Sequence, residues 1–274
     1  MLSINLGPLA LPIGPLLLLS AGLVAAGVGH LVGRRQKIGI ANTLSDMLIA
    51  GLLVARVAFV IRWFDTYRAA PWSMLDIRDG GFTLWAGIAA ALGVALWRGG
   101  RQPALRKPLI AGLAAGALVW GGLFGALRMT EKPVLPALAM TSLAGTPTQL
   151  AALADGKPMV VNLWASWCPP CRREMPVLAA AQQRETGVRF VFVNQGEDAE
   201  TAQRYLSAGG LDLANVLLDA DAALGGAVGS GALPTTLFYD ADGRLVATHL
   251  GELSAASLVS KLNQLRPSTD APNR

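Results

Sequence analysis

Hydrophobic patterning divides this chain into two halves that differ in the length of their apolar runs. Four long apolar stretches occupy the first half: Leu9–Val32, Leu44–Phe64, Phe82–Trp97 and Leu109–Leu127. A membrane-spanning helix needs about 20 apolar residues, so the first, second and fourth stretches are long enough and the third is short. The first lacks a basic leader and exceeds a signal-peptide core, which favours an uncleaved helix. We therefore expect an α-helical membrane domain over residues 1–127, with about four transmembrane helices.

The second half has short apolar runs that alternate with helical patterns. A Pro-containing linker is expected over 128–140, a folded domain over 141–266 and a tail over 267–274. Alternation of strands and helices, closed by a hairpin and a last helix, predicts an α/β domain. The expected strands are 141–143, 148–150, 159–164, 188–194, 216–218, 235–239 and 245–250, and the expected helices are a cysteine-containing one to about 185, 198–208, 220–228 and 254–265.

Composition and charge support a membrane protein. The chain has 53% hydrophobic and 15% charged residues, whereas charged residues supply about a quarter of a soluble domain. Its net charge of +5 arises largely from Lys and Arg in two short loops between the apolar stretches, as is typical of the cytoplasmic loops of membrane proteins. We therefore expect no nucleic-acid partner. These loop residues are Arg34, Arg35, Lys37, Arg98, Arg101, Arg106 and Lys107. Because positive loops stay cytoplasmic, both chain ends and the α/β domain should face the periplasm or its equivalent, with the lipid bilayer as a partner.

The candidate chemistry lies in two cysteines that follow a buried strand. Cys168 and Cys171 should occupy the first turn of a helix, where Pro169 and Pro170 are well tolerated. Free N–H groups and the helix dipole there should lower the pKa of the Cys168 thiol. Cys171, one turn further along, could resolve a mixed disulfide formed at Cys168. The spacing therefore predicts dithiol–disulfide chemistry.

Half of a zinc site is the alternative interpretation of this spacing. The chain has only these two cysteines and two histidines, His30 in an apolar segment and His249, so four zinc ligands are hard to assemble. We therefore expect neither a metal nor another cofactor.

The cysteine segment carries a family resemblance. Its residues are Trp164, Ala165, Ser166, Trp167, Cys168, Pro169, Pro170 and Cys171. This run resembles the thioredoxin superfamily, and more closely the membrane-tethered extracytoplasmic oxidoreductases of the TlpA, ResA and CcmG kind. The resemblance implies a thioredoxin-like fold with a redox-active Cys168–Cys171 disulfide. It also implies that Pro234 forms a cis peptide bond, lies against Cys168 and exposes backbone groups that pair with an extended substrate.

Three further positions depend on this resemblance. Asn162 replaces the buried Asp of plain thioredoxins, and an amide cannot accept the proton of the resolving thiol. Glu174 stands where ResA-like proteins have an acid near the dithiol, and a solvated helix-face charge is the alternative. Glu197 resembles the acid of an Asn-x-Gly-Glu segment in the ResA group, and an acidic helix start is the alternative. Pro176 is expected to kink the cysteine helix.

The first 125 residues resemble the N-terminal part of prolipoprotein diacylglyceryl transferase. The similar segments are Ile13–Leu16, Val54–Val60 and Gly80–Gly87. That family has His and Gly where this chain has Trp85 and Ala86, and its later catalytic segment has no counterpart here. Lipid transfer is therefore not expected. Arg56 lies near the middle of the second span, where a charge indicates either a functional residue or a pin to a neighbouring acid or carbonyl.

The sequence as a whole predicts a membrane-anchored extracytoplasmic thiol–disulfide oxidoreductase that reduces protein disulfides. Cys168 would attack the substrate, Cys171 would resolve the mixed disulfide and Pro234 would position the substrate. A separate membrane electron donor is expected because the membrane half has no cysteine. Two alternatives stay open: a dithiol oxidase that uses the same residues, and a lipid- or lipoprotein-binding membrane module with an accessory redox domain.

Overall fold

The computed structural model describes residues 3–6, 9–34, 38–68, 70–129 and 134–265. Within these residues the chain forms two compact units, and each is described by itself. One contains the long apolar helices and the other contains the sheet that carries the cysteines. The predicted tail 267–274 and residues 130–133 of the predicted linker lie outside the described residues.

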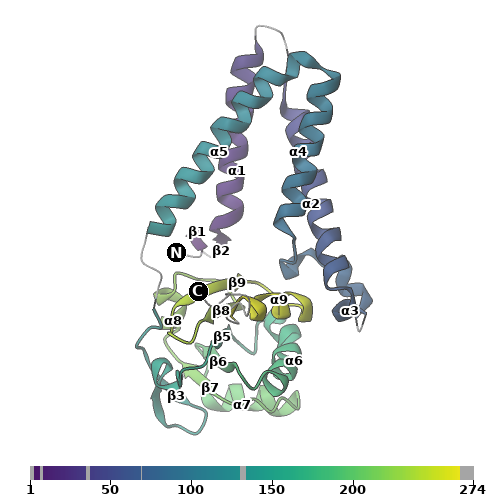
Figure 1. Cartoon of the computed structure of the whole chain (residues 1–274). Helices are drawn as coiled ribbons and strands as arrows, with labels where there is room; N and C mark the ends of the chain where they lie inside the picture. The colour runs from purple at the N-terminus through teal and green to yellow at the C-terminus, as the bar shows by residue number, and fades with distance from the viewer. Residues whose placement is uncertain (1–2, 7–8, 35–37, 69, 130–133, 266–274) are drawn as a thin grey trace, which may run out of the picture. The chain divides into compact units, whose positions relative to one another are not determined.

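The N-terminal half is helical, as its apolar stretches predict (Figure 1). Among the residues that the structure describes, three segments are long and apolar enough to cross a membrane: Ile13–Gly33, Ala41–Arg62 and Pro103–Leu127. They correspond to the first, second and fourth predicted stretches. The elements are β1 (Ser3–Leu6), β2 (Leu9–Pro12), α1 (Ile13–Gly33), α2 (Ala41–Arg62), α3 (Phe64–Tyr67), the 3-10 turns η2 (Pro71–Leu75), η3 (Ile77–Asp79) and η4 (Pro103–Leu105), α4 (Leu84–Arg101) and α5 (Arg106–Met129).

The predicted start of the first helix at Leu9 is wrong. Residues Leu9–Pro12 form β2, which pairs antiparallel with β1, and α1 begins at Ile13. Proline disfavours the helical conformation in the residue before it, so Pro12 keeps Leu11 extended. An apolar run alone does not distinguish a strand from the first turn of a helix.

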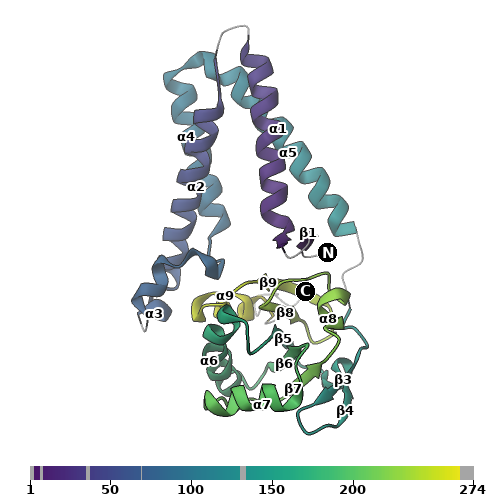
Figure 2. The ribbon, with the colours of Figure 1, turned by 180° about the vertical axis from the view of Figure 1, so that it is seen from behind.

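The long helices pack in two pairs, α1 with α5 and α2 with α4, in both views (Figures 1 and 2). Glycines allow the close approach. A Cβ atom on Gly112 of α5 would lie 2.6 Å from the Ala25 carbonyl oxygen, and one on Gly87 of α4 would lie 2.8 Å from that of Gly51. Small residues at such contacts let the backbones of membrane helices pack directly. An ion pair between Arg98 and Asp46 also joins α4 to α2.

The C-terminal half is an α/β domain built on a seven-stranded sheet of order β4-β3-β7-β6-β5-β8-β9. Strands β5, β6 and β7 are parallel, and β8 and β9 form an antiparallel hairpin beside β5. The predicted strands and helices are present, with ends shifted by a few residues. The elements are β3 (Ala139–Ser142), β4 (Pro147–Gln149), η5 (Leu150–Leu153), β5 (Met159–Trp164), α6 (Pro169–Arg184), β6 (Arg189–Gln195), α7 (Ala199–Ala208), β7 (Val216–Asp219), α8 (Ala223–Ala227), β8 (Thr235–Tyr239), β9 (Leu245–Leu250) and α9 (Ala255–Leu265).

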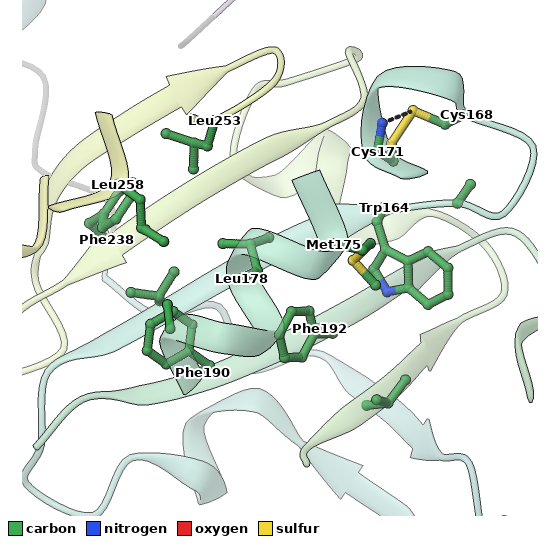
Figure 3. Close-up of a cluster of buried hydrophobic side chains, with 14 of the residues drawn as sticks. Trp164, Cys168, Cys171, Met175, Leu178, Phe190, Phe192, Phe238, Leu253 and Leu258 are labelled. Carbon is green, nitrogen blue, oxygen red and sulfur yellow. Dashed lines mark hydrogen bonds between the residues drawn. A yellow bond between two sulfur atoms is a disulfide. The ribbon is translucent and has the colours of Figure 1, made fainter. Parts of the chain in front are cut away.

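The central strand β5 is buried on both faces, which explains its continuous apolar run. Val160 and Trp164 face a cluster that includes α6 and α9, and part of this cluster is drawn in Figure 3. Val161 and Leu163 face the opposite cluster, which includes Leu224 of α8. This double packing fixes the carboxyl end of β5, from which the cysteine turn departs. Helix α6 continues through Pro176 as one element.

Candidate redox-active site

The two cysteines form a disulfide at the start of α6. Their sulfur atoms are 2.05 Å apart, and both residues are buried (Figure 3). Cys168 is the N-cap of α6, and its Sγ accepts a hydrogen bond from the Cys171 N–H at 3.3 Å. Unpaired N–H groups at a helix N-terminus favour negative charge. A thiolate at Cys168 would therefore be stabilised here once the disulfide is reduced.

Local sequence explains how the turn is built. The Cys168 N–H donates to the Ala165 carbonyl at 3.2 Å, which closes the turn after β5. Pro169 and Pro170 are the first two residues of α6, where a missing N–H costs no helical hydrogen bond. The side chain of Trp167 is 67% exposed beside the buried disulfide. The turn thus presents an aromatic surface next to the cysteines.

Glu174 lies on α6 one turn after Cys171 and is fully buried. Its Oε1 accepts a hydrogen bond from Asn162 Nδ2 at 2.7 Å, and its Oε2 accepts one from the Leu253 N–H at 2.8 Å. Burial raises the pKa of Glu174 to about 8, against these two hydrogen bonds, which lower it. The interpretation of Glu174 as a solvated helix-face charge is therefore wrong.

Asn162 connects Glu174 to the hairpin. Its Nδ2 also donates to Thr236 Oγ1 on β8 at 3.0 Å. Residues 162 and 174 share one face because β5 and α6 pack together around the same core. An uncharged amide on β5 and a carboxyl on α6 thus form a buried pair in the interior of the domain. The carboxyl, not the amide, can take up and release a proton at this place.

Pro234 is preceded by a cis peptide bond, as the resemblance implied. Its own carbonyl accepts a hydrogen bond from the Gly251 N–H at 2.9 Å, and proline has no N–H. The Pro234 carbonyl is therefore engaged within the domain, and pairing of an extended substrate with backbone groups beside this cis bond stays a prediction. Leu233, the residue before it, packs against the cluster that contains both cysteines.

Glu197 connects the turn before the cysteines to the end of β6. Its carboxylate accepts hydrogen bonds from the Ser166 N–H at 2.8 Å and from Asn194 Nδ2 at 2.6 Å, and a third comes from the Ser166 hydroxyl. The N-cap of α7 is the next residue, Asp198, which accepts from the Thr201 N–H at 2.7 Å. Glu197 therefore does not cap this helix; it holds Ser166, two residues before Cys168.

An open groove of about 460 Å³ runs along the exposed side of α6. Arg172 lies over the ring of Tyr205 at 5.8 Å from its centroid, and Tyr205 lies 5.4 Å from the ring of Trp164. This groove was not expected from the sequence, because its walls come from residues about 35 positions apart. It is lined by Pro169, Arg172, Arg173, Pro176, Tyr205, Gly209 and Leu211.

Arg56 in α2 donates hydrogen bonds to backbone carbonyls of the loop between α2 and α4. The acceptors are the carbonyl oxygens of Ser73 at 3.2 Å, Met74 at 3.0 Å, Asp76 at 2.7 Å and Gly81 at 2.9 Å. The structure thus agrees with a pin to neighbouring carbonyls.

Family comparison matches the C-terminal half of the chain. The Redoxin family profile covers residues 129–265, half of the sequence. This chain belongs to the redoxin family. Its α/β domain is therefore of the thioredoxin type, and the chain is a thiol–disulfide oxidoreductase.

Three curated relatives agree with this assignment. The thiol:disulfide interchange protein DsbE of Escherichia coli is 34% identical over 56% of this chain and 88% of its own length. DsbE of Yersinia pestis is 38% identical over 45% of this chain, and the match spans 65% of that protein. The thiol-disulfide oxidoreductase ResA of Bacillus thuringiensis is 29% identical over 58% of this chain and 92% of its length. A solved secreted disulfide oxidoreductase of Mycobacterium tuberculosis is 28% identical, covering 46% of this chain and 95% of its own, with a TM-score of 0.42.

Proposed function

We propose that this redoxin is a membrane-anchored, extracytoplasmic oxidoreductase that reduces protein disulfides. The observation that carries the proposal is the Cys168–Cys171 disulfide at the N-terminus of α6, where the Cys171 N–H points at Cys168 Sγ. A disulfide between these cysteines becomes a dithiol on accepting two electrons and two protons. The homologous proteins named DsbE and ResA support exchange with protein thiols.

The reaction would proceed by two exchanges. The Cys168 thiolate attacks a substrate disulfide, breaks its S–S bond and forms a mixed disulfide, and one substrate sulfur leaves as a thiolate. Cys171 then attacks Cys168 Sγ, which releases the second substrate thiol and leaves the enzyme oxidised. The substrate gains two electrons and the enzyme loses two.

Pro234, Glu174 and Trp167 would support these steps. A substrate strand would pair with the backbone at Leu233, because the Pro234 carbonyl is already bonded to Gly251. Burial raises the pKa of Glu174 to about 8. Glu174 would therefore accept the proton that the buried Cys171 thiol releases as it becomes a nucleophile. The exposed ring of Trp167 would contact the substrate.

The membrane half would hold the redox domain at the extracytoplasmic surface. Helices α1, α2, α4 and α5 would span the membrane, with the basic loops between α1 and α2 and between α4 and α5 in the cytoplasm. Only two cysteines occur in the chain, so the electrons that regenerate the dithiol would come from a separate membrane donor. We propose a membrane domain over residues 1–127, a linker over 128–140 and a redox domain over 141–266.

Trapping of substrates tests the mechanism. Cys171→Ser should accumulate mixed disulfides with extracytoplasmic proteins, whereas Cys168→Ser should accumulate none and should lack disulfide reductase activity. Full reductase activity in Cys168→Ser would rule out the proposal.

The reduction potential of the cysteine pair tests the direction of the reaction. A value well below about −200 mV would fit a reductant supplied by a membrane donor. A value near the ~−120 mV of strong periplasmic oxidants would instead assign the protein to disulfide formation.

A further inference from the structure

The loop between α2 and α4 exposes large apolar side chains. Trp72 is 85% exposed, Leu75 75% and Ile77 65%, and all three lie on or beside the short 3-10 turns. Loops in water are normally polar, and a group of exposed large apolar residues indicates an interaction surface. Phe64 at one end of the loop and Trp85 at the other are also exposed.

The polar backbone of the same loop is satisfied from within the protein. Arg56 is buried, and its guanidinium donates to the carbonyls of Ser73, Met74 and Asp76 in the loop. At membrane depth, non-helical backbone is tolerated only when its polar groups find partners inside the protein. The loop thus turns its carbonyls inward to an arginine and its apolar side chains outward.

Aromatic packing and a backbone contact hold this arrangement in place. Arg56 Cζ lies 5.6 Å from the centroid of the buried Tyr67 ring, which packs edge-on against Phe59 at 6.5 Å. The Thr83 N–H donates to the Ala55 carbonyl in α2 at 2.9 Å, so the end of the loop is fixed to the helix. A Cβ atom on Gly81 would lie 2.5 Å from the Phe59 ring, so a larger residue there would have to displace that ring. The loop is an ordered element rather than a simple connection.

Continuity with α2 identifies the occupant of this surface. The 22-residue helix α2 is long and apolar enough to span a membrane, and it ends immediately before the loop. In the membrane arrangement proposed above α2 spans the bilayer, so the loop lies near one membrane surface. Tryptophan is enriched at the headgroup level of bilayers, and charged residues mark the aqueous side of that zone. Asp65 and Arg68 supply such charges on the same loop, with side chains 96% and 70% exposed.

We propose that residues 71–77 form an interfacial element that inserts Trp72, Leu75 and Ile77 into one leaflet of the lipid bilayer. The insertion would fix the depth of the carboxyl end of α2. It would resemble the way an amphipathic segment lies in the plane of a membrane surface, with its apolar side reaching the boundary between headgroups and acyl chains. The partner of this surface is lipid rather than another protein.

Fluorescence quenching by labelled lipids tests this proposal in the full chain. Cys168→Ser combined with Cys171→Ser removes both native cysteines, so a single new cysteine can be labelled with an environment-sensitive dye. Leu75→Cys and, separately, Trp72→Cys would carry the dye in phosphatidylcholine vesicles. The vesicles would contain nitroxide lipids labelled at the headgroup, near the top of the acyl chain or near its end.

We expect the dye at Leu75 and Trp72 to be quenched most strongly by the nitroxide near the top of the acyl chain. Two matched variants calibrate the scale. Leu53→Cys places the dye at an exposed position within α2, where the nitroxide near the end of the acyl chain should quench it most. Asp242→Cys places the dye in the exposed turn between β8 and β9, where none of the three nitroxide lipids should quench it. Quenching like that of Asp242, with or without a blue-shifted emission, would place the loop in water or against protein and overturn the proposal. Strongest quenching by the deep nitroxide would overturn it as well.

Discussion

Asn162 Nδ2 donates a hydrogen bond to Glu174 Oε1 at 2.7 Å, so the amide on β5 and the acid on α6 form one buried pair. Where plain thioredoxins carry an Asp on the strand, this chain has an Asn, and the ionisable group lies on the cysteine helix instead. The pKa of Glu174 is raised to about 8, chiefly by burial. The carboxyl therefore keeps its proton at neutral pH in the disulfide form.

This pKa predicts a pH dependence of stability. The ordinary pKa of the Glu174 carboxyl is 4.5, so an unfolded chain releases the proton at a lower pH than the folded one. Protonated Glu174 makes its full contribution to the free energy of unfolding below about pH 4.5. As the pH rises from there to about 8, this contribution is lost at about 1.4 kcal/mol per pH unit. Glu174→Gln should remove this part of the decline, as measured by melting temperature against pH.

Infrared spectroscopy gives a direct measure of the Glu174 proton. The carbonyl stretch of a protonated carboxyl should be present at pH 6 in the oxidised protein and disappear with a midpoint near 8. It should be missing in Glu174→Gln and unchanged in Glu200→Gln, whose side chain is 84% exposed. An unchanged band in Glu174→Gln would contradict the assignment.

Much of the redox domain could be predicted from local pattern. Strand β5 is a continuous apolar run because both faces are buried, and α9 follows Ser254, whose Oγ accepts from the Ser257 N–H at 3.1 Å as a cap does. The cysteine turn could also be predicted, because its prolines and the spacing of its cysteines are local features of the sequence.

Contacts between residues far apart in the chain could not be predicted from the sequence. Glu197 looks like part of an acidic helix start, yet it binds Ser166, 31 residues earlier, because β5 and β6 pair in parallel and bring their carboxyl ends together. The burial of Glu174 likewise depends on Leu253, 79 residues later. The hairpin of β1 and β2 was missed because an apolar run fits a strand as well as a helix.

The hydrogen bonds of Glu197 predict a positioning role for this residue. Glu197→Ala leaves the Ser166 N–H and Asn194 Nδ2 without their acceptor, and we expect a melting temperature lower by a few degrees. Loss of the carboxylate near the cysteine turn should also favour the Cys168 thiolate and make the reduction potential less negative. Glutathione equilibration of the Cys168–Cys171 pair measures this shift.

Asp198→Ala is the matched control for Glu197→Ala. It removes the N-cap of α7, which typically costs about 1 kcal/mol, without touching Ser166. The melting temperature should fall while the reduction potential stays at the wild-type value. Equal potentials in both variants would show that Glu197 only stabilises the fold.

Two glycines of α4 should respond in opposite directions to the same substitution. In Gly87→Ala the new Cβ would lie 2.8 Å from the Gly51 carbonyl oxygen, so α2 and α4 must move apart and thermal stability in detergent should fall. Gly93 has open space around its Cβ position, and Gly93→Ala should raise stability slightly because alanine favours helices by about 1 kcal/mol over glycine. The monodisperse fraction after heating measures both, and equal effects would refute the α2–α4 packing.

Arg56 should control the order of the loop between α2 and α4. Arg56→Met removes the donor from the partly buried carbonyls of Ser73, Met74 and Asp76, and each lost hydrogen bond costs about 0.5–1.5 kcal/mol. Because every 1.4 kcal/mol of lost local stability raises the open population tenfold, trypsin should cut after Arg68 at least about ten times faster in detergent. Arg62→Met, at the exposed end of α2, should leave the cleavage rate unchanged. Equal rates in the two variants would mean that the loop does not depend on the Arg56 hydrogen bonds.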